Sequence, residues 1–165
     1  MATEKLKFKL ELWATMWDQP PHVEILIGDK SYFKNPITGT EKDPDVIEFE
    51  HECEEGKNYE LIINRSNKLP GQTVVEWDQT DQANKIVKDQ LLHIKSIEID
   101  EIDIGGLVYE GVYTPQYPEP WKTSWLLAGN DLPETLKNVT IMGHDGEWKF
   151  TFSSPFYIWL LENLY

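Results

Sequence analysis

Two stretches of the sequence carry side chains that could bind a ligand. The first, Glu76-Trp77-Asp78-Gln79-Thr80-Asp81, holds carboxylates at positions 76, 78 and 81, and Asp89 follows it. Several oxygens from one loop suit calcium, which takes about six to eight oxygen ligands. The spacing does not match an EF-hand, and a solvated acidic loop is the plainer interpretation of the same residues. If this segment binds a cofactor, its oxygens favour calcium.

The second stretch, residues 108–130, is aromatic and contains Pro115, Pro118 and Pro120. A spacing of four is typical of a helix face, but each proline removes a backbone donor and disfavours helix before it. We therefore predict an extended aromatic arm. Flat rings stack on sugars, anchor protein interfaces or cover a core. The predicted glycan or protein contacts are Trp77, Tyr113, Tyr117, Trp121 and Trp125.

The residue types usual in catalytic and zinc sites lack the necessary spacing. The four histidines, His22, His51, His93 and His144, fall on separate predicted strands or turns. The single Cys53 excludes an internal disulfide, and no nucleophile or nucleotide motif is present. We expect no enzyme, with a glycosidase carboxylate pair as the remaining enzymatic alternative.

The length and charge of the chain limit its partners. A chain of 165 residues fits one domain, spanning 1–165, and its formal net charge of −14 repels phosphate backbones and anionic membranes. The longest apolar run is too short to cross a bilayer, and the first residues show no signal peptide. We therefore expect neither nucleic acid nor membrane as a partner.

Apolar and charged residues alternate along most of the chain, beginning at Leu6–Leu12, which indicates half-buried strands. The predicted fold is all-β, an antiparallel β-sandwich of the jelly-roll kind. Its core spans about 5–107 and 138–152, with a long polar excursion over 65–90. Phase shifts near Lys95-Ser96 and Asp100-Glu101 predict a bulge or bend. Turns at 55–57 and 143–146 predict two hairpins.

The C-terminal segment 154–165 is apolar almost all round. Ser154-Pro155 predicts the start of a short helix, with Ser154 as its capping residue, and a terminal strand is the alternative. So dense an apolar segment would be a liability if it were exposed. The predicted assembly interface comprises Phe156, Trp159, Leu160 and Leu164.

Several of these segments resemble calcium-dependent xylan-binding modules. The similar runs are Leu10–Trp13, Pro20–Gly28, Ile62–Asn64, Lys88–Ile94 and Ile97–Asp100. The resemblance implies a jelly roll in which Glu24, Asn64 and Asp89 are calcium ligands. The compact loop that precedes the late Asp in that family is replaced here by the insertion at 65–88.

The whole chain is also similar to small virion proteins of tailed phages, especially marine cyanobacterial ones. The runs Gly143–Phe150 and Ser154–Leu164 carry this similarity. It implies a structural component of a phage particle: a capsid decoration, neck, tail or fibre-associated protein. Such a protein is assembled in the host cytoplasm in many copies and contacts other virion proteins, with host surface glycans as a further partner. The alternative function is a calcium-dependent carbohydrate-binding module.

Overall fold

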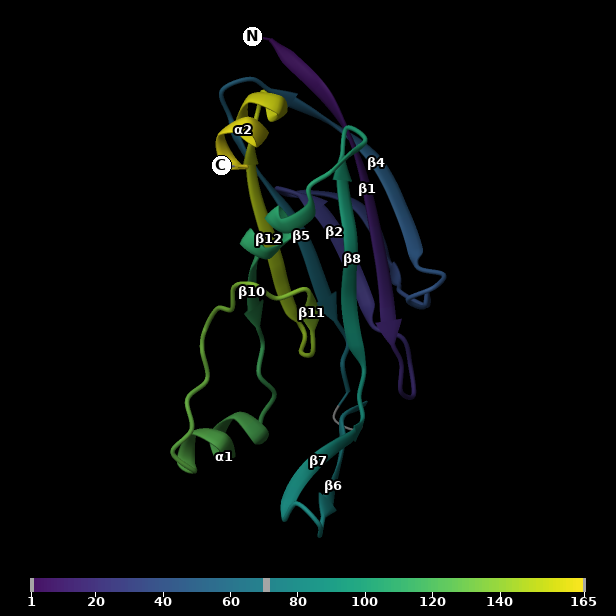
Figure 1. Ribbon diagram of the computed structural model, residues 1–165, viewed down its shortest axis with the longest axis vertical. Helices are drawn as coiled ribbons and strands as arrows, with labels where there is room; N and C mark the ends of the chain where they lie inside the picture. Colours follow the sequence, from purple (N-terminus) through teal and green to yellow (C-terminus); the bar gives the residue numbers. More distant parts are fainter. Residues whose placement is uncertain (1, 70–71, 165) are drawn as a thin grey trace.

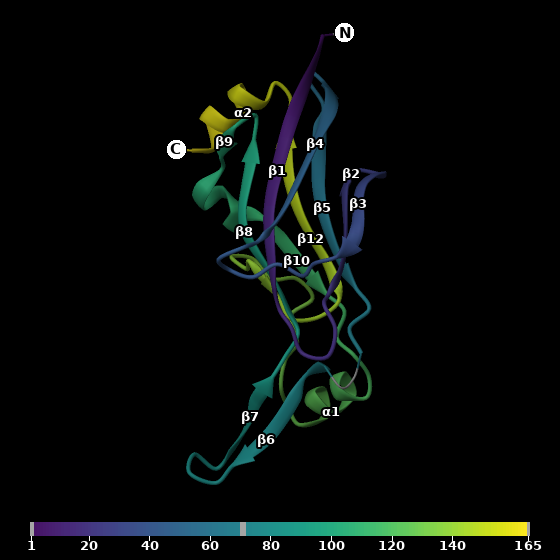
Figure 2. The same cartoon turned by 90° about the vertical axis from the view of Figure 1, so that its right-hand side faces the viewer.

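The computed structural model describes residues 2–69 and 72–164, which form two antiparallel sheets packed face to face (Figures 1 and 2). The first sheet consists, in spatial order, of β11 (Ile141–Met142), β8 (Leu91–Ile99), β1 (Thr3–Thr15) and β4 (Asp45–Glu54), with β9 (Ile102–Asp103) on β8. The second sheet consists of β10 (Val112–Pro115), β12 (Gly146–Ser153), β5 (Asn58–Ser66), β2 (His22–Ile27) and β3 (Lys30–Pro36). The predicted β-sandwich is therefore confirmed.

The alternation of β1 places its apolar side chains in the core. Leu6, Phe8, Leu10 and Leu12 are at most 1% exposed, while the intervening lysines and Glu11 lie on the outer face. Facing strands of the second sheet bury their own alternate residues against them, as in the pattern of β5. A sandwich core of two inner faces follows directly from this period of two.

The irregularities predicted in β8 are present. Glu11 of β1 faces Ser96 while Leu12 faces Ile94, so Lys95 is the extra residue of a bulge. Asp100 and Glu101 have φ of 54° and 67° in the turn between β8 and β9. Each phase shift of the sequence therefore marks a real departure from regular strand pairing.

The two predicted hairpins are wrong. The turn at 55–57 joins β4 of the first sheet to β5 of the second, and the turn at 143–146 joins β11 to β12 across the same gap. In each case the strands pair elsewhere, β4 with β1 and β12 with β5. A short Gly-containing turn can join two strands of one sheet or connect the two sheets. The strands alternate in the same way in either case, because each has one buried face.

The predicted C-terminal helix is confirmed as α2 (Phe156–Asn163), but its cap is not Ser154. The Glu4 carboxylate accepts the Phe156 N–H at 2.8 Å and the Ser154 hydroxyl. A charge contributed from β1 thus satisfies a free N–H at the helix start.

Two segments project from the end of the sandwich opposite α2 (Figure 1). The excursion at 65–90 contains a hairpin of β6 (Val74–Asp78) and β7 (Ala83–Lys88). The aromatic arm is shorter than predicted, because η2 (Gly105–Glu110) and β10 belong to the body of the sandwich. None of the described helices is long and apolar enough to cross a membrane.

The arm is also not fully extended, since it contains the helix α1 (Trp121–Leu127). Pro115, Pro118 and Pro120 all precede this helix, and Pro120 stands at its N-cap. A proline blocks helix before it but not after it. The spacing of four was therefore the correct signal for Trp121 and Trp125.

Candidate functional site

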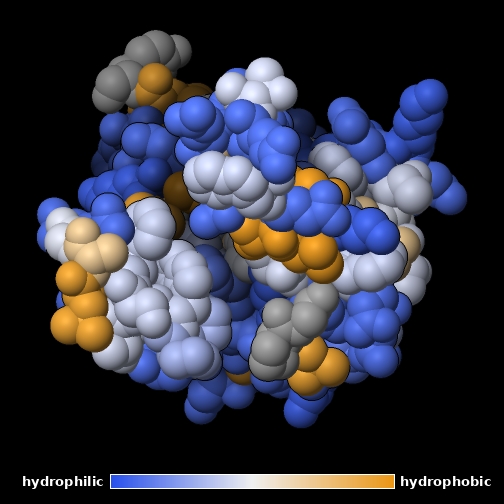
Figure 3. Space-filling model, turned by 90° about the horizontal axis from the view of Figure 1, so that it is seen from below, coloured by the Kyte–Doolittle hydropathy of each residue, from blue (hydrophilic) through white to orange (hydrophobic). Residues whose placement is uncertain are grey.

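The arm and the hairpin form two separate lobes at the base of the sandwich, the end opposite α2. Figure 3 looks at this end from below and shows apolar surface on both lobes and a recess between them. Of the predicted contact residues, Trp121 is 41% exposed, Trp125 39% and Trp77 59%. These three exposed tryptophans come from two distant parts of the sequence.

Trp121 and Trp125 lie one helical turn apart on α1 and form what we call the aromatic platform. Their ring centroids are 5.5 Å apart and their planes differ by 21°. Trp125 Nε1 donates to the Asp131 carbonyl at 3.2 Å. Tyr117 packs beside Trp121 with centroids 6.1 Å apart, and its hydroxyl donates to the Pro133 carbonyl at 2.7 Å. Contacts from residues before and after α1 thus fix the two tryptophan rings of the platform in one arrangement.

His144, in the connection between β11 and β12, supports the platform from the sandwich side. Its ring centroid lies 5.7 Å from that of Trp121 and 5.3 Å from that of Tyr117. The hydroxyl of Tyr113 donates to the His144 carbonyl at 2.5 Å and accepts its N–H at 3.0 Å. Sequence reasoning missed His144, because nothing in its neighbours shows that a turn of the chain meets the arm.

Tyr113 is not a surface contact, which corrects its predicted role. It lies on β10 and is only 2% exposed, because β10 pairs with β12 and turns this ring inward. Burial raises the pKa of Tyr113 to about 12. Its function is to hold His144, not to touch a ligand.

The hairpin has one apolar and one charged face. Val75 of β6 faces Ile86 of β7, and with Trp77 they are 50–62% exposed on one side. On the other side Lys85 pairs with Asp78 at 3.5 Å and with Asp81. Asp78 also accepts the N–H groups of the turn, so the predicted acidic loop is the tip of this hairpin.

A part-buried ionic cluster lies under both lobes. Lys68 Nζ lies 2.8 Å from Asp89 Oδ1 and donates to the Gly143 carbonyl, and its side chain is 12% exposed. The Lys68 N–H donates to both carboxylate oxygens of Asp145, at 3.0 and 3.1 Å. Asp89 Oδ1 further accepts the Thr73 hydroxyl at 2.7 Å. The cluster thus joins the feet of the hairpin to the turn that supports the platform.

Arg65 extends this cluster into the core, where it is 1% exposed. It donates to the Gln90 carbonyl at 2.8 Å, to Gln90 Oε1 at 2.6 Å and to the Met142 carbonyl. Burial lowers the pKa of this guanidinium, while Asp145 and Asp89 oppose that shift. The only arginine of the chain is therefore a structural tie between the two sheets, since Met142 lies in β11 and Arg65 in β5.

The pKa shifts in the cluster follow its burial and pairing. Burial lowers the pKa of Lys68, opposed by Asp89. Burial alone would raise the pKa of Asp89, but hydrogen bonds from Lys68, Thr73 and the Gln90 N–H outweigh it and lower that pKa. These directions follow from the partial burial of Lys68 and Asp89 and from the ion pair between them.

The predicted calcium ligands do not converge. Glu24 of β2 and Asn64 of β5 are cross-strand neighbours on the outer face of the second sheet. Asp89 instead follows β7 and is paired with Lys68. Among the described residues, no group of three or more His, Cys, Asp or Glu side chains could hold a metal ion. The residues present do not fit a calcium site, because strand pairing and Lys68 hold the three ligands in different environments.

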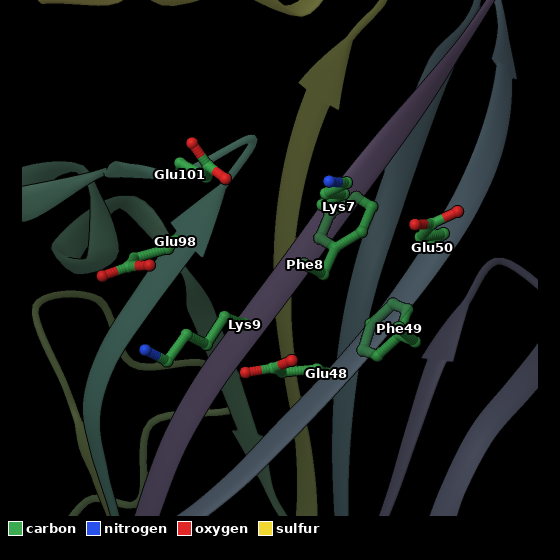
Figure 4. A pocket seen from close by; sticks show the side chains of 8 residues that line it. All are labelled: Lys7, Phe8, Lys9, Glu48, Phe49, Glu50, Glu98 and Glu101. Carbon is green, nitrogen blue, oxygen red and sulfur yellow. The ribbon is translucent and has the colours of Figure 1, made fainter.

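The outer face of the first sheet carries a shallow pocket, shown in Figure 4. Lys7 and Lys9 of β1 stand opposite Glu50 and Glu48 of β4, and Lys9 also faces Glu98 of β8. Such cross-strand pairs of opposite charge stabilise an exposed sheet. We interpret this surface as a solvated ladder of charges.

The predicted assembly residues divide between core and surface. Phe156 is fully buried, Leu160 is 6% exposed and Trp159 packs partly against the core, so an interface role for Phe156 and Leu160 is wrong. Leu164 is 53% exposed. The exposed apolar residues of α2 are Tyr157, Ile158 and Leu161, and Leu164 is exposed just after the helix. The helical period turns Ile158 and Leu161 away from Phe156 and Leu160.

Comparisons with known proteins add one structural similarity. No protein-family model matches the sequence, and no curated protein matches it. Among solved structures, the chain is similar to vCBM60 in its selenomethionine form, which comes from work on a circular permutation linking two families of calcium-dependent carbohydrate binding modules. The identity is 9% over 88% of this chain and 89% of that one, with a TM-score of 0.49. At these values neither a family nor a residue role is carried over.

Proposed function

We propose that this protein is a non-enzymatic glycan-binding domain whose binding surface is the base of the sandwich. The observation that carries this proposal is the aromatic platform. Trp121 and Trp125 are near-parallel, about two-fifths exposed and fixed by Tyr117, His144 and the Asp131 carbonyl. Rigid tryptophan rings offer a large amphipathic surface and lose little conformational freedom on binding.

The charge of the chain favours an uncharged ligand. With a net charge of −14, the protein repels phosphorylated and strongly acidic ligands over the distance that salt leaves unscreened. A neutral sugar ring carries no such penalty, and its C–H face packs on an indole ring. Trp77, on β6 of the other lobe, is a further exposed tryptophan at the same end of the molecule. We therefore propose a neutral oligosaccharide or polysaccharide as the ligand.

Binding to a panel of neutral polysaccharides, measured by affinity electrophoresis and then by calorimetry, tests the proposal. In Trp121→Ala and Trp125→Ala the dissociation constant should rise at least about tenfold, about 1.4 kcal/mol, because a stacking face is lost. Tyr157→Ala removes an aromatic ring that is 48% exposed on α2, at the other end of the molecule, and is the matched control. Unchanged binding by the Trp121→Ala/Trp125→Ala variant, or no binding across the panel, would contradict the proposal.

A second candidate function is a structural component of a phage particle. The exposed apolar face of α2 supports it, because this face lies at the end of the molecule opposite the platform (Figure 1). A domain with an apolar docking face at one end and a ligand surface at the other suits an adhesion protein carried on a particle. Mass spectrometry of purified particles, counting this chain against the major capsid protein, tests this role. Absence of the chain from the particles would reject it.

A further inference from the structure

The base of the sandwich gathers the kinds of oxygen that a hard cation prefers. The carboxylates of Asp89 and Asp145 and the carbonyl of Gly143 come from different segments of the chain and meet around Lys68. Carboxylate and carbonyl oxygens are the usual ligands of calcium. The ammonium of Lys68 donates to Asp89 and Gly143, whereas Asp145 accepts the Lys68 backbone N–H.

Three of the four carboxylate oxygens of this group already accept hydrogen bonds. Asp89 Oδ1 accepts from Lys68 Nζ at 2.8 Å, from the Thr73 hydroxyl at 2.7 Å and from the Gln90 N–H at 2.8 Å. Both oxygens of Asp145 accept the backbone N–H of Lys68. A divalent ion would have to displace these donors to coordinate those three oxygens.

The charges of the cluster also balance without a metal ion. The two carboxylates, Asp89 and Asp145, are matched by the cations Lys68 and Arg65, which interact with both of them. Adding a divalent cation would leave two uncompensated positive charges in a part-buried cluster, which is unfavourable. Removing Lys68 would instead leave a part-buried carboxylate without its partner.

We propose that the Lys68 ammonium is the structural cation of the base, so that this end of the sandwich is held together without a divalent ion. One lysine does this for both lobes. Its ammonium joins Asp89 at the foot of the hairpin to the carbonyl of Gly143, the residue before His144, whose ring supports the platform. The proposal concerns stability and does not depend on the proposed glycan function.

Thermal unfolding of the full chain, with calcium chloride or EDTA at matched ionic strength, tests the proposal first on the unmodified protein. The melting temperature should be the same in millimolar calcium and in EDTA. Lys68→Ala, which opens the cation position, should melt about 10 °C lower in EDTA. Millimolar calcium or ethylammonium should restore part of that loss, because either cation can then take the position.

Two variants control this experiment. Lys68→Ala/Asp89→Asn lacks the carboxylate, so calcium should leave its melting temperature unchanged. Lys85→Ala breaks an exposed pair on the hairpin and should shift the melting temperature by no more than about 2 °C. A calcium-stabilised or EDTA-sensitive unmodified protein would overturn the proposal, as would a Lys68→Ala variant that is as stable as Lys85→Ala or responds to neither cation. If Lys68→Ala does not fold in EDTA, folding on addition of calcium or ethylammonium is the expected result, and no recovery in either overturns the proposal.

Discussion

His144 lies between the exposed platform and the part-buried ionic cluster. Its ring is tilted by 32° against that of Trp121, with centroids 5.7 Å apart. Its backbone is hydrogen-bonded to the hydroxyl of Tyr113. The next residue, Asp145, accepts the N–H of Lys68. A disturbance of the cluster should therefore reach the platform through this one turn of the chain, which allows stability and binding to be tested together.

Acidification should destabilise the fold and loosen the platform. Burial lowers the pKa of His144 from its ordinary 6.5, and Lys68 and Arg65 add to this effect. The unfolded chain therefore binds the proton more readily than the folded one, so stability falls as the pH drops below about 6.5, down to the lowered folded pKa. Melting temperatures measured between about pH 7.5 and pH 5.5 should decline, and less steeply in His144→Gln.

His51 provides the matched control for this titration. Its pKa is also lowered, by burial and by Lys30, and it contacts Tyr32 and Tyr59 away from the platform. His51→Gln should also flatten the pH dependence of the melting temperature, but it should leave the affinity of the platform for its ligand unchanged. If His144→Gln follows the pH profile of the unmodified protein, the proton uptake that we assign to His144 occurs elsewhere.

Arg65→Lys should be strongly destabilising although it conserves the charge. The guanidinium spans Gln90 and Met142 with three hydrogen bonds inside the core, and an ammonium cannot reproduce that fork. We expect a loss of about 3 kcal/mol in the free energy of unfolding, measured by urea denaturation. Lys149→Arg, at an exposed pair with Glu60, is the control and should change stability by less than about 0.5 kcal/mol. Equal stability of the two variants would rule out a tying role for Arg65.

Much of the sandwich was predictable from periodicity. The even-numbered apolar residues of β1 are the core, and the phase shift at Lys95 is a bulge, because burial of one face leaves no other solution for an alternating run. The helix α2 was predictable from its apolar run after Ser154-Pro155, although its cap comes from Glu4 in a distant strand. Local sequence determines elements of this kind because their stabilising contacts repeat along the chain.

The pairing of elements with one another was harder to predict from the sequence. Whether a Gly-containing turn returns within one sheet or crosses to the other depends on the other strands, so both predicted hairpins were wrong. Exposure of the aromatic residues also depends on pairing: Trp77, Trp121 and Trp125 are exposed, whereas Tyr113 is buried by β10–β12 pairing. The ionic cluster around Lys68 joins residues up to 77 positions apart, and no local pattern predicts it.

Gly111 at the foot of the arm should not tolerate a side chain. A Cβ at this position would lie 2.2 Å from the indole ring of Trp148, which is fully buried and cannot withdraw without disturbing the core. Gly111→Ala should therefore cost about 2 kcal/mol or more in the free energy of unfolding. Gly106→Ala, a few residues earlier and with open space around its Cβ, is the control and should be near neutral. Similar chemical denaturation curves for both variants would contradict the close packing of the arm on Trp148.

Substitutions on the buried face of α2 should affect stability, whereas substitutions on its exposed face should affect docking. Phe156 is fully buried and packs near Phe152 and Trp159, so Phe156→Ala should lose about 3 to 5 kcal/mol in urea denaturation. Leu161 is 63% exposed on the outer face, so Leu161→Ala should keep the free energy of unfolding within about 0.5 kcal/mol. If the protein docks on a particle through this end, Leu161→Ala should lower its copy number on purified particles while its stability stays intact. A loss of stability in Leu161→Ala would instead make the outer face part of the fold, and the docking role would then need another surface.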